Sequence, residues 1–165
     1  MLKTTGLMMT LSAAATLLVA AVVHTASAED SAAQATYRDI EHTLGSVPTF
    51  FKMFPAIGIA GAWTEFKSVQ LNPETKLNGK TKELLGLAVA AQIPCQYCIY
   101  FHTAAAKLNG ASDEEIRETV AMAAVVRHWS TVLNGMQVDF AGFQKETDAV
   151  LKAAAEKAKS AAKSQ

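Results

Sequence analysis

Hydrophobic positions recur at helical spacing along most of the chain, and no alternating, strand-like stretch of useful length interrupts them. Alanine is abundant, and runs of β-branched residues are short. The sequence therefore predicts an all-α protein, a single-domain bundle of short and medium helices. The predicted helices cover residues 33–44, 49–71, 80–91, 95–108, 112–133 and 137–159.

Helix boundaries are marked most clearly in the middle of the chain. Pro94 ends the helix over residues 80–91, because proline lacks an amide donor and clashes with the preceding turn. Asn109-Gly110 is a C-terminal stop for the next helix. Ser112 and Glu115 have capping-box spacing, which predicts that another helix starts there. Pro55 and nearby glycines are expected to interrupt the helix over residues 49–71 locally.

The first 28 residues have the layout of a secretory signal peptide. Lys3 supplies a positive start, Leu7–Val23 is mostly apolar, and Ala26-Ser27-Ala28 offers small residues for cleavage after Ala28. An uncleaved membrane anchor is the alternative, since about 17 apolar residues can just cross a bilayer. A polar stretch follows at once without a basic flank. We therefore expect cleavage and a periplasmic or secreted protein, with no membrane contact after the leader is removed.

Charge and motif content exclude several classes of function. Lysine plus arginine number 15 and aspartate plus glutamate number 15, and no basic stripe is interleaved with aromatic residues. A nucleic-acid partner is therefore not expected. The sequence also lacks a glycine-rich phosphate loop and a nucleotide-binding fingerprint, so no cofactor is expected.

The only two cysteines, Cys95 and Cys98, lie three positions apart. Paired cysteines in an exported protein usually form a structural disulfide. A disulfide across so short a loop restrains little of the unfolded chain, because its entropic effect grows with loop length. Redox or metal chemistry is therefore the better interpretation of this pair.

His102 follows Cys98 by four positions, so both side chains lie on one helical face. If the helix begins near Pro94, exposed amides and the helix dipole favour a thiolate in its first turn. A histidine on the same face can accept the thiol proton, directly or through water.

Glu83 lies on the preceding predicted helix, with eleven residues between it and Cys95. A chain break at Pro94 could fold that helix back beside the cysteine helix, where the carboxylate could orient His102. A solvated carboxylate near a helix start is the alternative, and spacing alone favours it.

Together, Glu83, Cys95-Gln96-Tyr97-Cys98 and His102 resemble the signature of alkylhydroperoxidase D-like proteins in the carboxymuconolactone decarboxylase family. The flanks 80–85 and 109–116 look similar too. The likeness extends over residues 45–135, which we take as the domain. Residues 29–44 then form an N-terminal helical segment, and residues 136–165 form a C-terminal helix and polar tail.

This resemblance implies a catalytic set of four residues, and we expect no bound metal. Cys98 would be the peroxidatic thiol that attacks a hydroperoxide substrate, and Cys95 would resolve the sulfenic acid to a disulfide. His102 and Glu83 would form the proton relay. An external dithiol or disulfide reductant would restore the thiols. Members of the family are helical and commonly assemble into trimers or larger rings, so we expect a homo-oligomer.

Two features depart from the family pattern. Alkylhydroperoxidase D has a histidine just before the peroxidatic cysteine, where this chain has Tyr97. Tyrosine can donate a hydrogen bond but is a poor base near neutral pH, so the efficiency of peroxide reduction is an open question. The leader is the second departure, because an exported protein needs an electron donor on the oxidising side.

Other interpretations of the cysteine pair remain. A haem attachment site is excluded, because it would need histidine where Ile99 stands, and a thioredoxin motif is disfavoured, because it would need flanking strands. Disulfide exchange would use the same thiols. A zinc-binding structural module could use Cys95, Cys98 and His102 with Glu83 or His128. A carboxymuconolactone-type decarboxylase would generally lack the cysteine pair, and no anion pocket is evident among the three arginines, Arg38, Arg117 and Arg127.

Two further clusters of large apolar residues are assigned to packing. Val125, Val126, Trp129 and Leu133 are spaced as a core-facing stripe, with His128 packed beside it or at an interface. Phe50, Phe51 and Phe54 are expected in the core or in a subunit contact.

Overall fold

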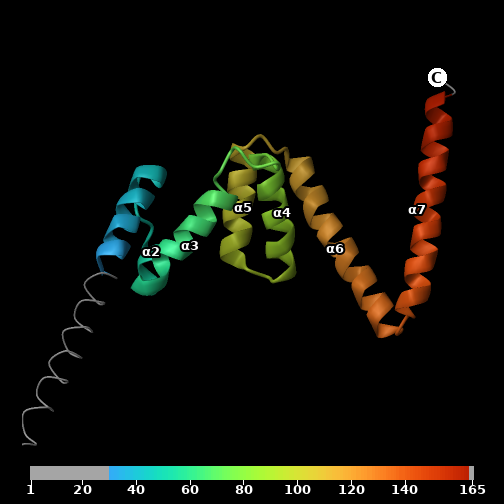
Figure 1. The fold of residues 1–165 in the computed structure, drawn as a ribbon, viewed down its shortest axis with the longest axis horizontal. Coiled ribbons are helices and arrows are strands. Elements are labelled where there is room, and N and C mark those ends of the chain that lie inside the picture. Colours follow the sequence, from blue (N-terminus) through green and yellow to red (C-terminus); the bar gives the residue numbers. More distant parts are fainter. Residues whose placement is uncertain (1–29, 164–165) are drawn as a thin grey trace, which may run out of the picture. The chain divides into compact units, whose positions relative to one another are not determined.

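All regular secondary structure in the part that the computed structural model describes, residues 30–163, is helical (Figure 1). The all-α prediction is therefore confirmed, and no strand occurs within those residues. Residues 1–28, the predicted leader, lie outside the described residues. Helical residues 30–44 are followed by α2 (Thr49–Met53), α3 (Ala56–Val69), α4 (Gly79–Gln92), α5 (Gln96–Leu108), α6 (Asp113–Gly135) and α7 (Phe140–Lys163).

The chain divides into two compact units between Lys76 and Leu77. The first contains helical residues 30–44, α2 and α3, and its core includes the buried side chains of Ile40, Ile59 and Trp63. The stretch predicted as one interrupted helix forms α2 and α3, with Pro55 as the N-cap of α3. The interruption at this proline is therefore confirmed.

Aromatic rings and one carboxylate join the helices of the first unit. The Trp63 ring stacks on Phe66 with 5.8 Å between ring centroids, and Phe51 meets Trp63 edge-on at 5.6 Å. Trp63 Nε1 donates to Asp39 Oδ2 at 2.6 Å, and Lys67 Nζ donates to both carboxylate oxygens at 2.9 and 2.8 Å. These bonds, with Lys67 first, lower the pKa of Asp39 below its ordinary value.

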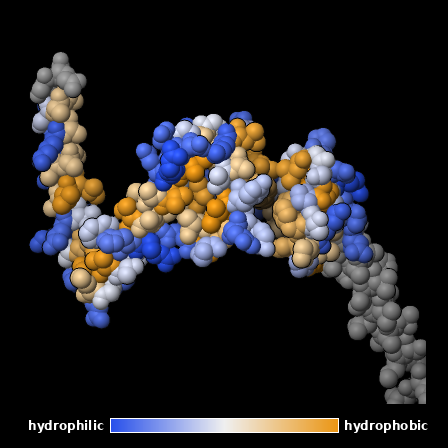
Figure 2. Space-filling model, turned by 180° about the vertical axis from the view of Figure 1, so that it is seen from behind, coloured by the Kyte–Doolittle hydropathy of each residue, from blue (hydrophilic) through white to orange (hydrophobic). Residues whose placement is uncertain are grey.

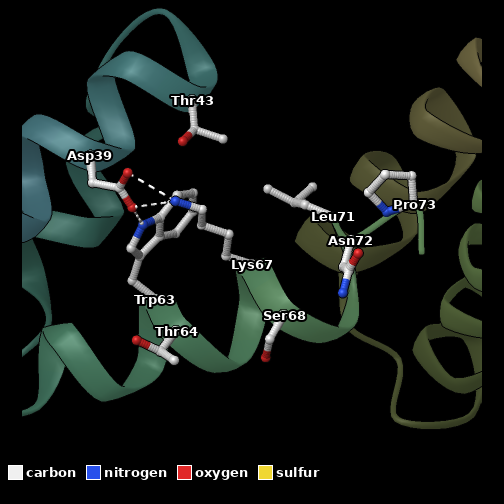
Figure 3. A pocket seen from close by; sticks show the side chains of 9 residues that line it. All are labelled: Asp39, Thr43, Trp63, Thr64, Lys67, Ser68, Leu71, Asn72 and Pro73. Atoms are coloured by element: carbon white, nitrogen blue, oxygen red, sulfur yellow. Dashed lines mark hydrogen bonds and ion pairs between the residues drawn. The ribbon is translucent and has the colours of Figure 1, made fainter. Parts of the chain in front are cut away.

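A cavity of about 550 Å³ lies beside this carboxylate (Figure 3). Its lining combines the Asp39–Trp63–Lys67 group with hydroxyl and apolar side chains, all from the first unit. Every polar group in that trio already has a partner within the unit, so these bonds serve to hold the helices together.

The second unit places α4 and α5 side by side, with α6 packed mainly on α4 (Figure 1). Small residues at the crossings, Ala90, Ala106 and Ala123, are buried and let the helices approach closely. α4 ends at Gln92 and α5 begins at Gln96, so the chain reverses over three residues around Pro94, as the sequence predicts.

Polar contacts fix the beginnings of α4 and α6. The Ser112 side chain accepts from the Glu115 amide at 3.1 Å, and Glu115 accepts from the Ser112 amide at 2.8 Å. The predicted capping box is therefore confirmed. Lys80 Nζ lies 2.7 Å from the other Glu115 oxygen, which ties α4 to α6 and lowers the pKa of Glu115.

The predicted core-facing stripe on α6 is wrong for the single chain. Val125, Val126 and Trp129 are about half exposed, and Leu133 is only half-buried. α6 buries Ala123 instead, on the face that it turns toward α4. Of the phenylalanine cluster, Phe51 is half-buried, whereas Phe50 and Phe54 are exposed.

Hydrophobic side chains thus reach the surface in the part of the molecule formed by α4 to α6 (Figure 2). α7 has no buried residue. Among residues 30–163, none of the helices combines the length and apolarity needed to cross a membrane.

Candidate active site

The cysteine pair occupies the beginning of α5. Cys95 is the N-cap residue with an extended backbone, and its Sγ accepts the backbone N–H of Cys98 at 3.2 Å. Cys95 itself donates its N–H to the Ala90 carbonyl at 3.1 Å, which links the turn back to α4. A disulfide joins the two cysteines, whose Cα atoms are 5.3 Å apart. The pair is therefore in its oxidised form, at the end of the helix where a thiolate is favoured.

Glu83 and His102 are in direct contact. His102 Nδ1 lies 2.7 Å from Glu83 Oε2, and the exposed fractions of the two side chains are 18% and 6%. The interpretation of Glu83 as a solvated carboxylate is therefore wrong. The chain reversal at Pro94 brings α5 back along α4, so residues nineteen positions apart meet.

This contact fixes which nitrogen of His102 is available for chemistry. An ionised carboxylate only accepts hydrogen bonds, so Nδ1 carries the proton that bonds to Glu83. In the neutral ring the lone pair then lies on Nε2. His102 can therefore take up a proton at Nε2 while Glu83 stabilises the resulting charge.

Gly86 completes the environment of His102, and sequence reasoning missed it. A Cβ atom built on Gly86 would overlap three atoms of the imidazole ring, so the ring packs against the bare backbone of α4. Glycine within a helix costs about 0.5–1 kcal/mol relative to alanine. A glycine inside a predicted helix, one turn after Glu83, is therefore unexpected, and this is the sequence signal that could have identified Gly86.

A second contact that the sequence did not reveal fixes the end of α4. Arg127 on α6 donates from Nε to Gln92 Oε1 at 2.6 Å and from a terminal nitrogen to the Gln92 carbonyl at 2.8 Å. The Gln92 amide in turn donates to the Ala123 carbonyl. Because Gln92 ends α4 three residues before Cys95, this clamp holds the turn that carries the cysteines.

Other candidate residues lie apart from this centre. Tyr97 is largely exposed, at 79%, so the position before Cys98 faces solvent. His128 is exposed and meets the Trp129 ring edge-on at 5.4 Å. Within residues 30–163, no group of three or more histidine, cysteine, aspartate or glutamate side chains is placed to hold a metal ion.

Comparison with known proteins adds the decisive observation. Residues 58–141, about half of the chain, match the model of the carboxymuconolactone decarboxylase family. The chain belongs to this family. The matched range contains the whole Glu83, Cys95, Cys98 and His102 arrangement, so the predicted family is confirmed.

A solved family structure shares the fold. The alkylhydroperoxidase AhpD core from Rhodospirillum rubrum is 27% identical and matches with a TM-score of 0.58 over 66% of this chain and 82% of its own. A relative in Paracoccus denitrificans, an uncharacterized protein numbered 4 in the cox locus, is 39% identical over 51 residues. That alignment covers 31% of this chain and 46%, about half, of the relative.

Proposed function

We propose that this protein is a thiol-dependent oxidoreductase that reduces hydroperoxides through Cys98 and Cys95, with His102 and Glu83 as the proton relay. The observation that carries the proposal is the His102–Glu83 contact on the helix pair that also holds the cysteine pair. The name of the Rhodospirillum rubrum relative, an alkylhydroperoxidase, supports the choice of substrate class.

The proposed oxidative half of the cycle consumes one hydroperoxide. His102 accepts the Cys98 thiol proton at Nε2, and the thiolate attacks the terminal oxygen of the hydroperoxide. The O–O bond breaks, the proton returns to the departing oxygen to give the alcohol, and Cys98 becomes a sulfenic acid. The Cys95 sulfur then attacks the Cys98 sulfur, which forms the disulfide and releases water.

The reductive half returns two electrons and two protons. An external dithiol attacks the disulfide, passes through a mixed disulfide and leaves as its own disulfide, with both cysteines reduced. The Cys98 amide, already bonded to Cys95 Sγ, would stabilise a Cys95 thiolate when that sulfur leaves. Tyr97 faces solvent, so the proposal assigns proton transfer to His102 and Glu83.

The proposal also includes a cellular location and an oligomeric state. From the predicted leader, we propose that the protein works in the periplasm or outside the cell, so its reductant must operate there as well. The exposed apolar side chains of the second unit favour a homo-oligomer, because a second copy would remove them from water. On α4 these are Leu85 and Val89, followed at the same four-residue spacing by Ile93 at the C-cap, and on α6 they are Met122, Val125, Val126 and Trp129.

A peroxide titration of the fully reduced protein tests the activity. We expect both thiols to disappear at one equivalent of hydroperoxide, with a mass decrease of about 2 Da as the disulfide forms. Thiols that survive excess peroxide but react with a small-molecule disulfide would replace peroxide reduction with disulfide exchange. Retention of about one zinc per chain in the reduced protein would instead favour a structural zinc module.

A further inference from the structure

The position of the His102 ring depends on the absence of a side chain at Gly86 on α4. A Cβ atom at Gly86 would overlap Cε1, Nδ1 and Nε2 of the imidazole. A long flexible side chain could swing away from such an overlap. The His102 ring can do so only by leaving Glu83, to which Nδ1 is bonded at 2.7 Å.

The helix backbone gives no other reason for glycine at this position. Gly86 lies inside α4, and the glycines with positive φ among the described residues are Gly45 and Gly110. Glycine inside a helix is less favourable than alanine, so its presence is a cost unless the missing Cβ is used. The atoms that use the space are those of one imidazole ring.

Glu83 and Gly86 act on the ring together. They are three residues apart, so α4 presents the carboxylate and the bare backbone on the same face, about one turn apart. The carboxylate binds Nδ1, and the glycine admits the ring to the depth at which that bond can form.

We infer that Gly86 is a positioning residue for the His102 base: it admits the ring to Glu83 and thereby keeps the proton on Nδ1 and the lone pair on Nε2. Its effect on thiol chemistry rests on the proposed function, in which His102 activates the cysteine pair. Its effect on the ring rests on packing alone. The two can therefore be measured separately.

The test is a double-mutant cycle on the full chain with Gly86→Ala, His102→Ala and the pair together. We expect Gly86→Ala to lower the urea unfolding midpoint when the ring is present and to raise it, or leave it unchanged, when His102 is alanine. Gly61→Ala is the matched control, because Gly61 lies in α3 with open space around its Cβ position. That control should not lower the midpoint in either background.

A second readout reports on the ring itself. Nitrogen NMR of the reduced protein should show the Nδ1–H form of neutral His102 in the parent chain. In Gly86→Ala this form should lose its dominance. The pH midpoint of thiol alkylation should move upward by about one unit in Gly86→Ala, as in His102→Ala, which means about tenfold less thiolate at neutral pH.

The inference is overturned if Gly86→Ala changes the unfolding midpoint equally with and without the His102 ring, or leaves the Nδ1–H form dominant. Should Gly86→Ala fail to fold, a folded double variant supports the inference, and an unfolded one overturns it. A parent protein and a His102→Ala variant with the same alkylation profile would refute the base role in the proposed function. In that case the NMR readout and the unfolding cycle still decide the role of Gly86.

Discussion

His102 Nδ1 and Glu83 Oε2 lie 2.7 Å apart across the α4–α5 contact, with 94% of the Glu83 side chain removed from solvent. A carboxylate so deeply buried is stable as an ion only when a partner compensates the lost hydration. The pair therefore contributes both to folding and to the orientation of the proposed base.

Removing one member of this pair should have unequal effects. His102→Ala leaves a buried carboxylate without this partner and should destabilise the fold by about 3 kcal/mol. Glu83→Gln keeps an acceptor for Nδ1–H and should cost about 1 kcal/mol. Urea unfolding of both variants tests this order. Equal losses would show that leaving the Glu83 charge without His102 costs no more than removing that charge.

The division of labour between the cysteines predicts different trapped species. In Cys95→Ser the Cys98 sulfenic acid has no resolving thiol, so a dimedone-type probe should label it after one equivalent of peroxide. Cys98→Ser should lose turnover and show little labelling. Mass spectrometry locates the adduct, and equal labelling of the two variants would contradict the assignment.

The clamp at the end of α4 predicts a distant effect on the cysteines. Arg127→Ala removes two bonds to Gln92 and should destabilise the protein by about 1–2 kcal/mol, because charged donors make the stronger hydrogen bonds. Alkylation of the reduced Cys95 should change as the turn loosens. Arg117→Ala is the control, since Arg117 forms an exposed ion pair with Glu114 at 3.4 Å, and it should do neither.

In the first unit, the depressed pKa of Asp39 predicts a loss of stability in acid. A carboxyl whose folded pKa is lowered contributes stability above its unfolded value of 3.8, and this is lost as pH falls through the folded pKa. Fluorescence of Trp63 in a Trp129→Phe background should follow that loss, because Trp63 Nε1 bonds the carboxylate. Asp39→Asn should remove the Asp39 step from the acid profile. A step of the same size in both proteins would assign it elsewhere.

The exposed stripe on α6 predicts a change of assembly. If a second copy covers it, Trp129→Glu should lower the mass in sedimentation while the helical content remains, since Trp129 is 55% exposed in the single chain. Leu108→Glu is the control, as an exposed apolar residue outside the α4 and α6 stripes. A monomeric parent protein would remove the assembly from the proposal.

Much of the second unit could be predicted because its signals are local. Pro94, the Ser112–Glu115 capping box and Asn109-Gly110 each act within a few residues, and the helix boundaries follow them within one or two positions. Three of the candidate site residues, Cys95, Cys98 and His102, are local in the same sense, since they lie on a single turn-and-helix segment. Glu83 lies on α4, and only the family resemblance, not its spacing, predicts its role.

What could not be predicted depends on which surfaces of separate helices meet. The Gly86 space and the Arg127 clamp exist only because α4 contacts α5 and α6, and neither residue carries a motif. The α6 stripe was misplaced because apolar spacing indicates a surface that avoids water. It does not say whether this chain or another covers that surface.

Cys95 is at once the cap of a helix and half of a redox couple. Its sulfur accepts the Cys98 amide in the oxidised chain, and reduction would turn a weak neutral acceptor into one that carries charge when ionised. The arrival of electrons should therefore tighten the first turn of α5. Solvent exchange of one amide proton, that of Cys98, would then act as a built-in gauge of how reduced the protein is.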